Sequence, residues 1–189
     1  RRVKMIDMNE GESQAKWVSY KPQKDEWVYN DGEVEDANPT FIFDYKSIKA
    51  GWGKLQAGSP PEYHWWANIS IKEPQPSQEH KKALSVDLYF NSEHMKDVHS
   101  WTTNANGPVR GILAIYAQID VEKAGHGEML PVLKYVGSKE EKFSVGSTRI
   151  PQFEIVKWVD RPADWNDAPA PEVAPEPEAE EKPEDDIPF

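Results

Sequence analysis

The sequence predicts a mostly-β domain with one helix over residues 1–166, followed by a disordered acidic tail over residues 167–189. Short aromatic and β-branched runs recur along the first part between glycine, proline and asparagine residues, which is the pattern of strands joined by turns. The last 23 residues hold six of the 16 prolines, and nine acidic residues against a single lysine. A segment of this composition buries too little apolar surface to offset its ordering entropy, so we expect it to be disordered.

The sequence of the N-terminal part of the domain predicts a hairpin followed by another strand. Residues 16–21 and 26–30 are short aromatic and β-branched runs, and the turn-forming residues 22–25 join them. Residues 40–46 form the next predicted strand. The glycines on both sides of Trp52 indicate a bend at which the backbone approaches a neighbour closely.

The clearest predicted strands are residues 63–72 and 83–91, with a polar loop between them. Alternate side chains of a strand point to opposite faces, so each of these strands has one apolar and one polar face. Trp66 and Tyr89 fall on the polar faces, and they lie opposite each other if the two strands pair antiparallel. An exposed tryptophan beside an exposed tyrosine is typical of a platform on which nucleic-acid bases stack.

The C-terminal half of the domain predicts one helix and two more strands. Apolar residues in 109–121 recur at helical spacing, although Gly111 and the β-branched residues lower the helix propensity. Residues 129–137 and 152–159 are predicted strands, with residues 138–149 as a charged connection. Strands, one helix and further strands suit a five-stranded OB-fold barrel with extra N-terminal hairpin strands, and a β-sandwich is the competing architecture.

The sequence lacks the motifs of common enzyme classes. It has no cysteine, which excludes disulfides and thiolate metal sites, and no phosphate-loop, esterase or metalloprotease motif occurs. His94 and His99 are five residues apart, a spacing that does not place two ligands on one helix face. We therefore expect no catalysis, no cofactor and no metal site.

Charge and hydropathy bear on partners and location. The net charge is −11, but the tail carries −8 of it, so the domain itself is close to neutral. No apolar run reaches the length of about 18 residues that a membrane span needs, and the N-terminus shows no apolar signal region. We expect a protein of the cell interior without a membrane partner.

The end of the chain is an acidic pair followed by an apolar terminus: Asp185, Asp186, Ile187, Pro188 and Phe189. Such an end suits a linear peptide motif, in which Phe189 fills an apolar pocket of a partner and its carboxylate meets an arginine or lysine. The terminus resembles the C-terminal acidic tip of bacterial single-stranded DNA-binding proteins. The resemblance implies that this tip recruits replication and repair proteins and competes with DNA.

Three internal stretches make the domain similar to the single-stranded DNA-binding proteins of tailed phages, namely residues 43–45, 48–54 and 150–162. Together with the tip, this resemblance implies an OB-fold and sequence-tolerant coating of single-stranded DNA in phage replication and recombination, without catalysis. The implied partners are single-stranded DNA and host or phage replication and repair proteins. The implied location is the cytoplasm of the bacterial host.

Candidate DNA-binding residues are exposed aromatics, which stack on bases, and cations, which neutralise phosphates. Trp17 shares a strand face with Ser19 and Lys21. Lys142 and Arg149 lie in the predicted connection between the last two strands, a loop with which OB-folds grip nucleic acid. The full candidate set is Trp17, Trp52, Lys54, His64, Trp66, Lys72, Tyr89, Lys142 and Arg149. The tryptophans predicted to be structural are Trp101, Trp158 and Trp165.

The alternative function is a Trp-rich β-sandwich that binds carbohydrate on the same aromatic face. Exposed tryptophan serves both ligands, so the aromatic residues alone do not separate the two hypotheses. The acidic tip favours DNA, because a sugar-binding module has no use for a peptide of this chemistry.

Overall fold

The computed structural model describes residues 16–29, 37–91 and 96–167 of the chain. Within them the protein is mostly β with one α-helix, which confirms the predicted class. The strands are β1 (Trp17–Lys21), β2 (Glu26–Tyr29), β3 (Thr40–Lys54), β4 (Glu62–Trp65), β5 (Lys81–Asn91), β6 (Lys96–Thr103), β7 (Leu130–Phe143) and β8 (Gly146–Val159). The helix α1 spans Asn106–Glu122, and the 3-10 helices η1 (Lys123–Gly125) and η2 (Ala163–Asp167) follow α1 and β8.

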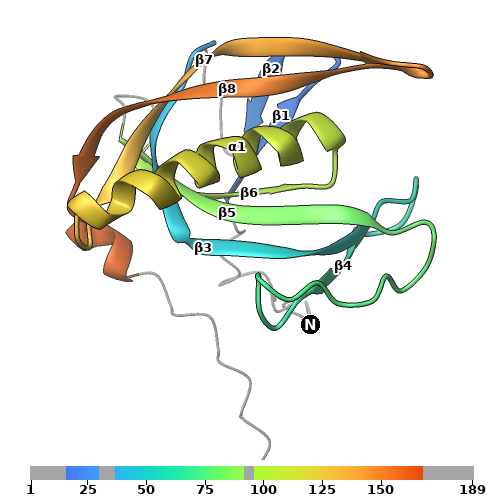
Figure 1. The fold of residues 1–189 in the computed structure, drawn as a ribbon, viewed down its shortest axis with the longest axis horizontal. Helices are drawn as coiled ribbons and strands as arrows, with labels where there is room; N and C mark the ends of the chain where they lie inside the picture. Colours follow the sequence, from blue (N-terminus) through green and yellow to red (C-terminus); the bar gives the residue numbers. More distant parts are fainter. Residues whose placement is uncertain (1–15, 30–36, 92–95, 168–189) are drawn as a thin grey trace, which may run out of the picture.

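All of these strands belong to one sheet with the order β2-β1-β6-β5-β3-β7-β8, and β4 pairs with β3 outside this path. The sheet curls around α1, so that β7 and β8 pass over one side of the helix while β3 and β5 pass along the other (Figure 1). β3 carries the curl, since it pairs with both β7 and β5 and its register shifts between Asp44 and Lys49. The described strands therefore form one curled sheet and not the two stacked sheets of the competing sandwich.

The N-terminal hairpin forms as predicted, with β1 and β2 paired antiparallel. β1 also pairs in parallel with β6, over two residues. The inward face of the hairpin buries Val18, Tyr20 and Trp27. The centroid of the Trp27 ring lies 5.0 Å from that of Trp101 and 5.6 Å from that of Tyr135. The hairpin thus fills the space between β6 and the β7–β8 pair with aromatic side chains.

Asp25 ties the turn of this hairpin to β7. Tyr20 and Tyr135 both donate hydrogen bonds to Oδ1 of Asp25, at 2.5 and 2.7 Å. Burial acts to raise the pKa of Asp25, but these bonds, a bond from Ser138 and the charge of Arg149 outweigh it and hold the pKa below its ordinary value. Burial also raises the pKa of both tyrosines. At neutral pH, Asp25 is therefore an ionised acceptor and the tyrosine hydroxyls are donors.

The predicted helix is confirmed by α1, and its glycines have a packing role. A Cβ atom at Gly107 would lie 2.6 Å from Oγ1 of Thr148, and one at Gly111 would lie 2.7 Å from Cγ of Pro151. These two glycines let the helix backbone approach β8 more closely than any side chain permits. The inward face of the helix buries Val109, Ile112, Ile115 and Ile119.

The prediction that residues 138–149 form a connection was wrong. β7 and β8 continue as a two-stranded ribbon until Phe143 pairs with Gly146, so only residues 144 and 145 turn the chain. The outer part of this ribbon is mostly exposed on both faces. Its sequence therefore lacks the alternation of apolar and polar residues that identifies a half-buried strand.

The prediction of a strand over residues 63–72 was also wrong beyond Trp65. β4 is short and pairs with β3, not with β5. The chain leaves the sheet because Oδ1 of Asn68 accepts a hydrogen bond from the backbone N–H of Ser70, closing a local turn. β5 instead pairs with β3 and with β6, a strand that the sequence analysis did not identify.

Candidate functional site

A groove with a volume of about 560 Å³ crosses the outer face of β1 and β6 and continues toward β4. β1 has its apolar side chains in the core, and the alternation of the strand turns Trp17, Ser19 and Lys21 outward into the groove. Trp17 is 44 % exposed, and the predicted common face of these three residues is confirmed. The groove is thus lined along one wall by an aromatic ring, a hydroxyl and an ammonium group.

The floor of the groove comes from β6, whose outward residues are held by hydrogen bonds to β5. Oγ of Ser100 donates to Asp87 at 2.7 Å, and the hydroxyl oxygens of Thr102 and Ser85 lie 2.8 Å apart. Ser100 and Thr102 both line the groove. Their side chains therefore make the floor of the groove polar.

The opposite wall includes Tyr63 of β4, whose ring is supported by Trp65. The rings of Tyr63 and Trp65 stack with a centroid distance of 5.1 Å, and Tyr63 lines the groove. A Cβ atom at Gly51 would lie 2.9 Å from Cε3 of Trp65, and one at Gly53 would lie 2.9 Å from Cε1 of Tyr63. The two glycines of β3 therefore accommodate the two rings. The predicted close backbone approach is confirmed here, whereas the predicted bend is wrong because β3 continues through both glycines.

The residues that line the groove include cations and no acid, whereas the whole chain is acidic. The lining includes Lys16 and Lys21 and no aspartate or glutamate, although the chain carries 33 acidic residues. Lys16 pairs with Asp97 at 2.8 Å. A ligand in the groove meets aromatic, hydroxyl and ammonium groups, and the neighbouring carboxylates of Asp97 and Asp87 are bonded to Lys16 and Ser100.

Arg149 lies in a second hollow of about 270 Å³ that continues from the groove. Pro22 and Gln23 line both hollows. Nη1 of Arg149 lies 3.9 Å from Oδ2 of Asp25. Lys142 lies on the same β7–β8 ribbon and is exposed. Both cations therefore sit on paired strands, and not in the loop that the sequence predicted, and Arg149 lies near the end of the groove.

The remaining predicted cations and Trp52 lie on the far side of β4 from the groove. Trp52 is buried, and its Nε1 donates to the carbonyl oxygen of Glu73 at 2.9 Å. Nζ of Lys72 lies 5.2 Å from the centroid of the Trp52 ring. Lys54 is ion-paired with Glu79. These residues hold the segment between β4 and β5 and do not line the groove.

The predicted stacking platform of Trp66 and Tyr89 was wrong. Tyr89 pairs across the sheet with Ile42 and Val98, and only 6 % of it is exposed. Its ring stacks on Trp165 at 5.5 Å, and a hydrogen bond to Asp164 raises the pKa of Tyr89 to about 12.

Trp66 is half-buried and packs against the core, with its ring 6.0 Å from that of Trp52. Neither Trp66 nor Tyr89 therefore offers a free ring face beside the other. The tryptophans predicted to be structural fit that role, because Trp101 and Trp165 are buried and Trp158 stacks on His126.

His64 points away from the groove and toward Glu62 and His80. Nε2 of His64 lies 2.7 Å from Oε1 of Glu62, and Nε2 of His80 lies 3.5 Å from the same oxygen. These three side chains form the one cluster of potential metal ligands found among the described residues. The sequence alone does not indicate this cluster, because His80 is 16 residues from His64 and joins it only through the fold.

Comparison of the chain with protein-family models, curated proteins and solved structures finds no match. Among the described helices, none combines the length and the apolar content that crossing a membrane requires. The predicted partner-binding residues Asp185, Asp186, Ile187, Pro188 and Phe189 lie outside the described residues.

Proposed function

We propose that this protein binds single-stranded DNA without sequence preference, and that the strand lies in the groove between β1 and β4. The observation that carries the proposal is the groove lining, in which Trp17 and Tyr63 accompany Lys16 and Lys21 without a carboxylate. Aromatic faces stack on any base, and cations neutralise phosphates, so this combination binds single strands of any sequence. The groove thus replaces the platform predicted from the sequence as the proposed contact surface.

The order of the strands supports the proposal. β3 pairs with both β5 and β7, β5 pairs with β6, and α1 connects β6 to β7. We infer that β3, β5, β6, β7 and β8 correspond to the five strands of an OB-fold, with the β1–β2 hairpin added beside β6. OB-folds bind oligonucleotides on the face of their second and third strands and with the loops after the first and fourth. The groove floor on β6 and the β7–β8 ribbon agree with that use.

The choice of polymer tests the proposal. The full chain is titrated separately with oligo-dT, with a duplex of equal length and with a hexasaccharide, all at equal salt. The tryptophan fluorescence of the protein reports the binding of each ligand. We expect oligo-dT to bind at least about tenfold more tightly than the duplex, because stacking needs unpaired bases.

The salt dependence gives a second readout of the same titration. The slope of log K against log salt is expected to be shallow, at about −0.7 for each phosphate neutralised, because few cations line the groove. Equal affinity for duplex and single strand contradicts the proposal. Binding of the hexasaccharide alone supports the carbohydrate alternative.

The tail is proposed to compete with DNA for the groove as a tethered acidic arm, while its tip separately binds partner proteins. Because the acidic arm is tethered, its effective concentration near its own domain is about millimolar. Deleting the tail, residues 167–189, is therefore expected to tighten oligo-dT binding several-fold at low salt, and less at high salt. Deleting Phe189 alone keeps the acidic side chains and removes the apolar anchor, so DNA affinity is expected to stay within about twofold while partner capture is lost.

Both tail variants are compared by oligo-dT titration and by pull-down from a bacterial lysate. A Lys182→Ala chain serves as the control for a tail change outside the tip. The separation of roles is refuted if loss of Phe189 tightens DNA binding as much as the full deletion and leaves the captured proteins unchanged.

A further inference from the structure

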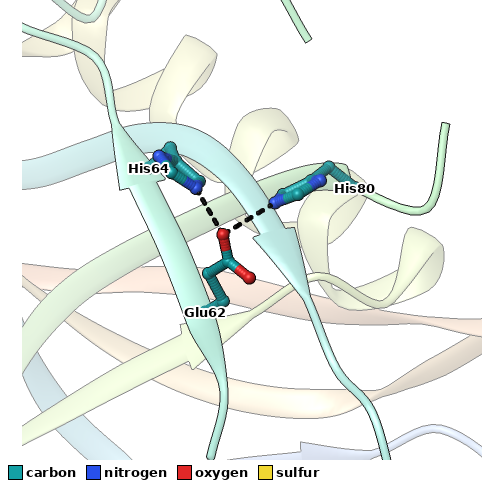
Figure 2. Close-up of side chains that lie close together, drawn as sticks. All are labelled: Glu62, His64 and His80. Atoms are coloured by element: carbon teal, nitrogen blue, oxygen red, sulfur yellow. Dashed lines mark hydrogen bonds and ion pairs between the residues drawn. The ribbon is translucent and has the colours of Figure 1, made fainter. Parts of the chain in front are cut away.

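Three potential metal ligands converge on the side of β4 that faces away from the groove. Glu62 and His64 are two residues apart on β4, so their side chains share one face of that strand. His80 immediately precedes β5, on the other side of β3 (Figure 2). One ligand atom from each residue lies within 4.8 Å of the other two. The pairing of β3 with β4 on one side and with β5 on the other therefore brings a carboxylate and two imidazoles to one point.

His80 distinguishes this cluster from an ordinary group of exposed polar side chains. It is 5 % exposed, and its Nε2 is buried without a hydrogen-bond partner. That nitrogen points at Glu62, as Figure 2 shows, from a distance beyond a normal hydrogen bond. A buried polar atom without a partner carries a free-energy cost. A cation at this position removes the cost by coordinating Nε2.

The other ring nitrogen of His80 is already held in the way that metal-ligating histidines usually are. Nδ1 lies 2.8 Å from Oγ of Ser77, and the carbonyl oxygen of His80 accepts a bond from Nε2 of Gln75 at 2.6 Å. Such outer contacts fix the ring orientation and leave Nε2 as the ligand. The ring is therefore preset before any ion arrives.

The neighbouring lysine does not neutralise the carboxylate of Glu62, so this carboxylate can bind a cation. Lys54 lies opposite Glu62 in the β3–β4 register, but its ammonium is paired with Glu79. The direct contacts of the Glu62 carboxylate are the two imidazoles. Two neutral imidazoles and one carboxylate give a site of net charge −1, which attracts a divalent cation.

We propose that Glu62, His64 and His80 bind one divalent transition-metal ion, with zinc the best match. Imidazole nitrogen and carboxylate oxygen suit zinc, and three protein ligands leave its fourth tetrahedral position open to water. Ligand atoms around a tetrahedral zinc are about 3.3 Å apart, and the Glu62 oxygen already lies 2.7 and 3.5 Å from the two nitrogens. The ion joins β4 to the start of β5 and closes the segment that carries Trp66 and Lys72.

Metal binding is tested on the untagged full chain after treatment with a chelator. Calorimetric titration with zinc chloride is expected to show one ion per chain, and cobalt(II) is expected to give the intense visible absorption of a tetrahedral complex. His80→Ala and His64→Ala are each expected to weaken zinc binding at least tenfold, because each removes one of three ligands. His126→Ala, which changes a histidine stacked on Trp158 outside the cluster, is the control and is expected to retain the wild-type affinity.

The side chain of His64 is more exposed than that of His80, so replacing His64 is less disruptive to the fold. The test therefore does not depend on a His80 variant that folds. The His64 side chain is about half exposed, so His64→Ala is expected to keep the wild-type circular dichroism even if loss of buried His80 disturbs the fold. Zinc is also expected to raise the melting temperature of the wild type and not that of His64→Ala. The proposal is overturned if His64→Ala binds zinc as tightly as the wild type, or if the wild type shows no one-to-one binding at micromolar zinc. DNA binding in the groove can fail without affecting either result, because the two sites lie on opposite faces of β4.

Discussion

Replacing Trp17 and Tyr63 together by alanine is expected to weaken oligo-dT binding by roughly 30-fold to 20,000-fold. Each base stacked on an aromatic ring contributes about 1–3 kcal/mol, and two lost stacks add to about 2–6 kcal/mol. The two rings stand on opposite walls of the groove, one on β1 and one on β4. Fluorescence anisotropy of labelled oligo-dT measures the loss directly.

Two controls separate stacking from a general loss of structure. Trp158→Ala removes a tryptophan of β8 that lies outside the groove lining, and it is expected to leave the oligo-dT affinity unchanged. Trp17→Phe with Tyr63→Phe keeps both ring faces and is expected to restore most of the affinity. A Trp17→Ala/Tyr63→Ala chain that folds normally and binds oligo-dT like the wild type removes the groove from the proposed mechanism.

Replacing Gly107 and Gly111 together by alanine is expected to lower the free energy of unfolding by about 2–5 kcal/mol. Helix propensity alone predicts the opposite sign, because alanine is favoured over glycine by about 1 kcal/mol at each helical position. Packing decides the outcome here. Each added methyl group would meet the backbone or ring atoms of β8 at Arg149 and Pro151, so the helix must move away from the sheet.

Urea unfolding followed by circular dichroism measures this change. Gly125→Ala is the matched control, because no heavy atom lies within 4 Å of a Cβ atom at that position. Its effect is expected to stay within about 0.5 kcal/mol. A Gly107→Ala/Gly111→Ala chain as stable as the wild type contradicts the close packing of α1 on β8.

Local patterns identified the elements whose partners are close in the sequence. The hairpin of β1 and β2 has its turn residues between two β-branched runs, and α1 has an apolar stripe of several turns. β6 escaped notice because its Val98, Trp101 and Thr103 are interrupted by histidine and serine, which the sequence alone does not place in the core. His99 is fully buried beside Phe90, and only the fold supplies that environment.

The candidate site was harder to predict, since it depends on contacts between distant segments. Tyr89 has the polar neighbours of an exposed residue, but Trp165 covers it from 76 positions further along the chain. Trp17 could be assigned to the outer face, because alternation within β1 alone decides its direction. Tyr63 could not be assigned to the groove without the knowledge that β4 pairs with β3 through two glycines.

The β1–β2 hairpin contacts the rest of the domain on two sides, at β6 and at the β7–β8 pair. Its backbone is bonded to β6 through a short parallel pairing, and within the described residues its contact with β7 and β8 is made by side chains. Separating that second contact breaks no strand ladder, so the buried side chains of the hairpin hold it against β7 and β8. Its contact with Tyr135 spans more than a hundred residues, and contacts between such distant segments slow folding. Because Trp17 is carried by this hairpin, a strand bound as proposed from β1 to β4 would hold the hairpin to the central strands, in addition to the short pairing of β1 with β6.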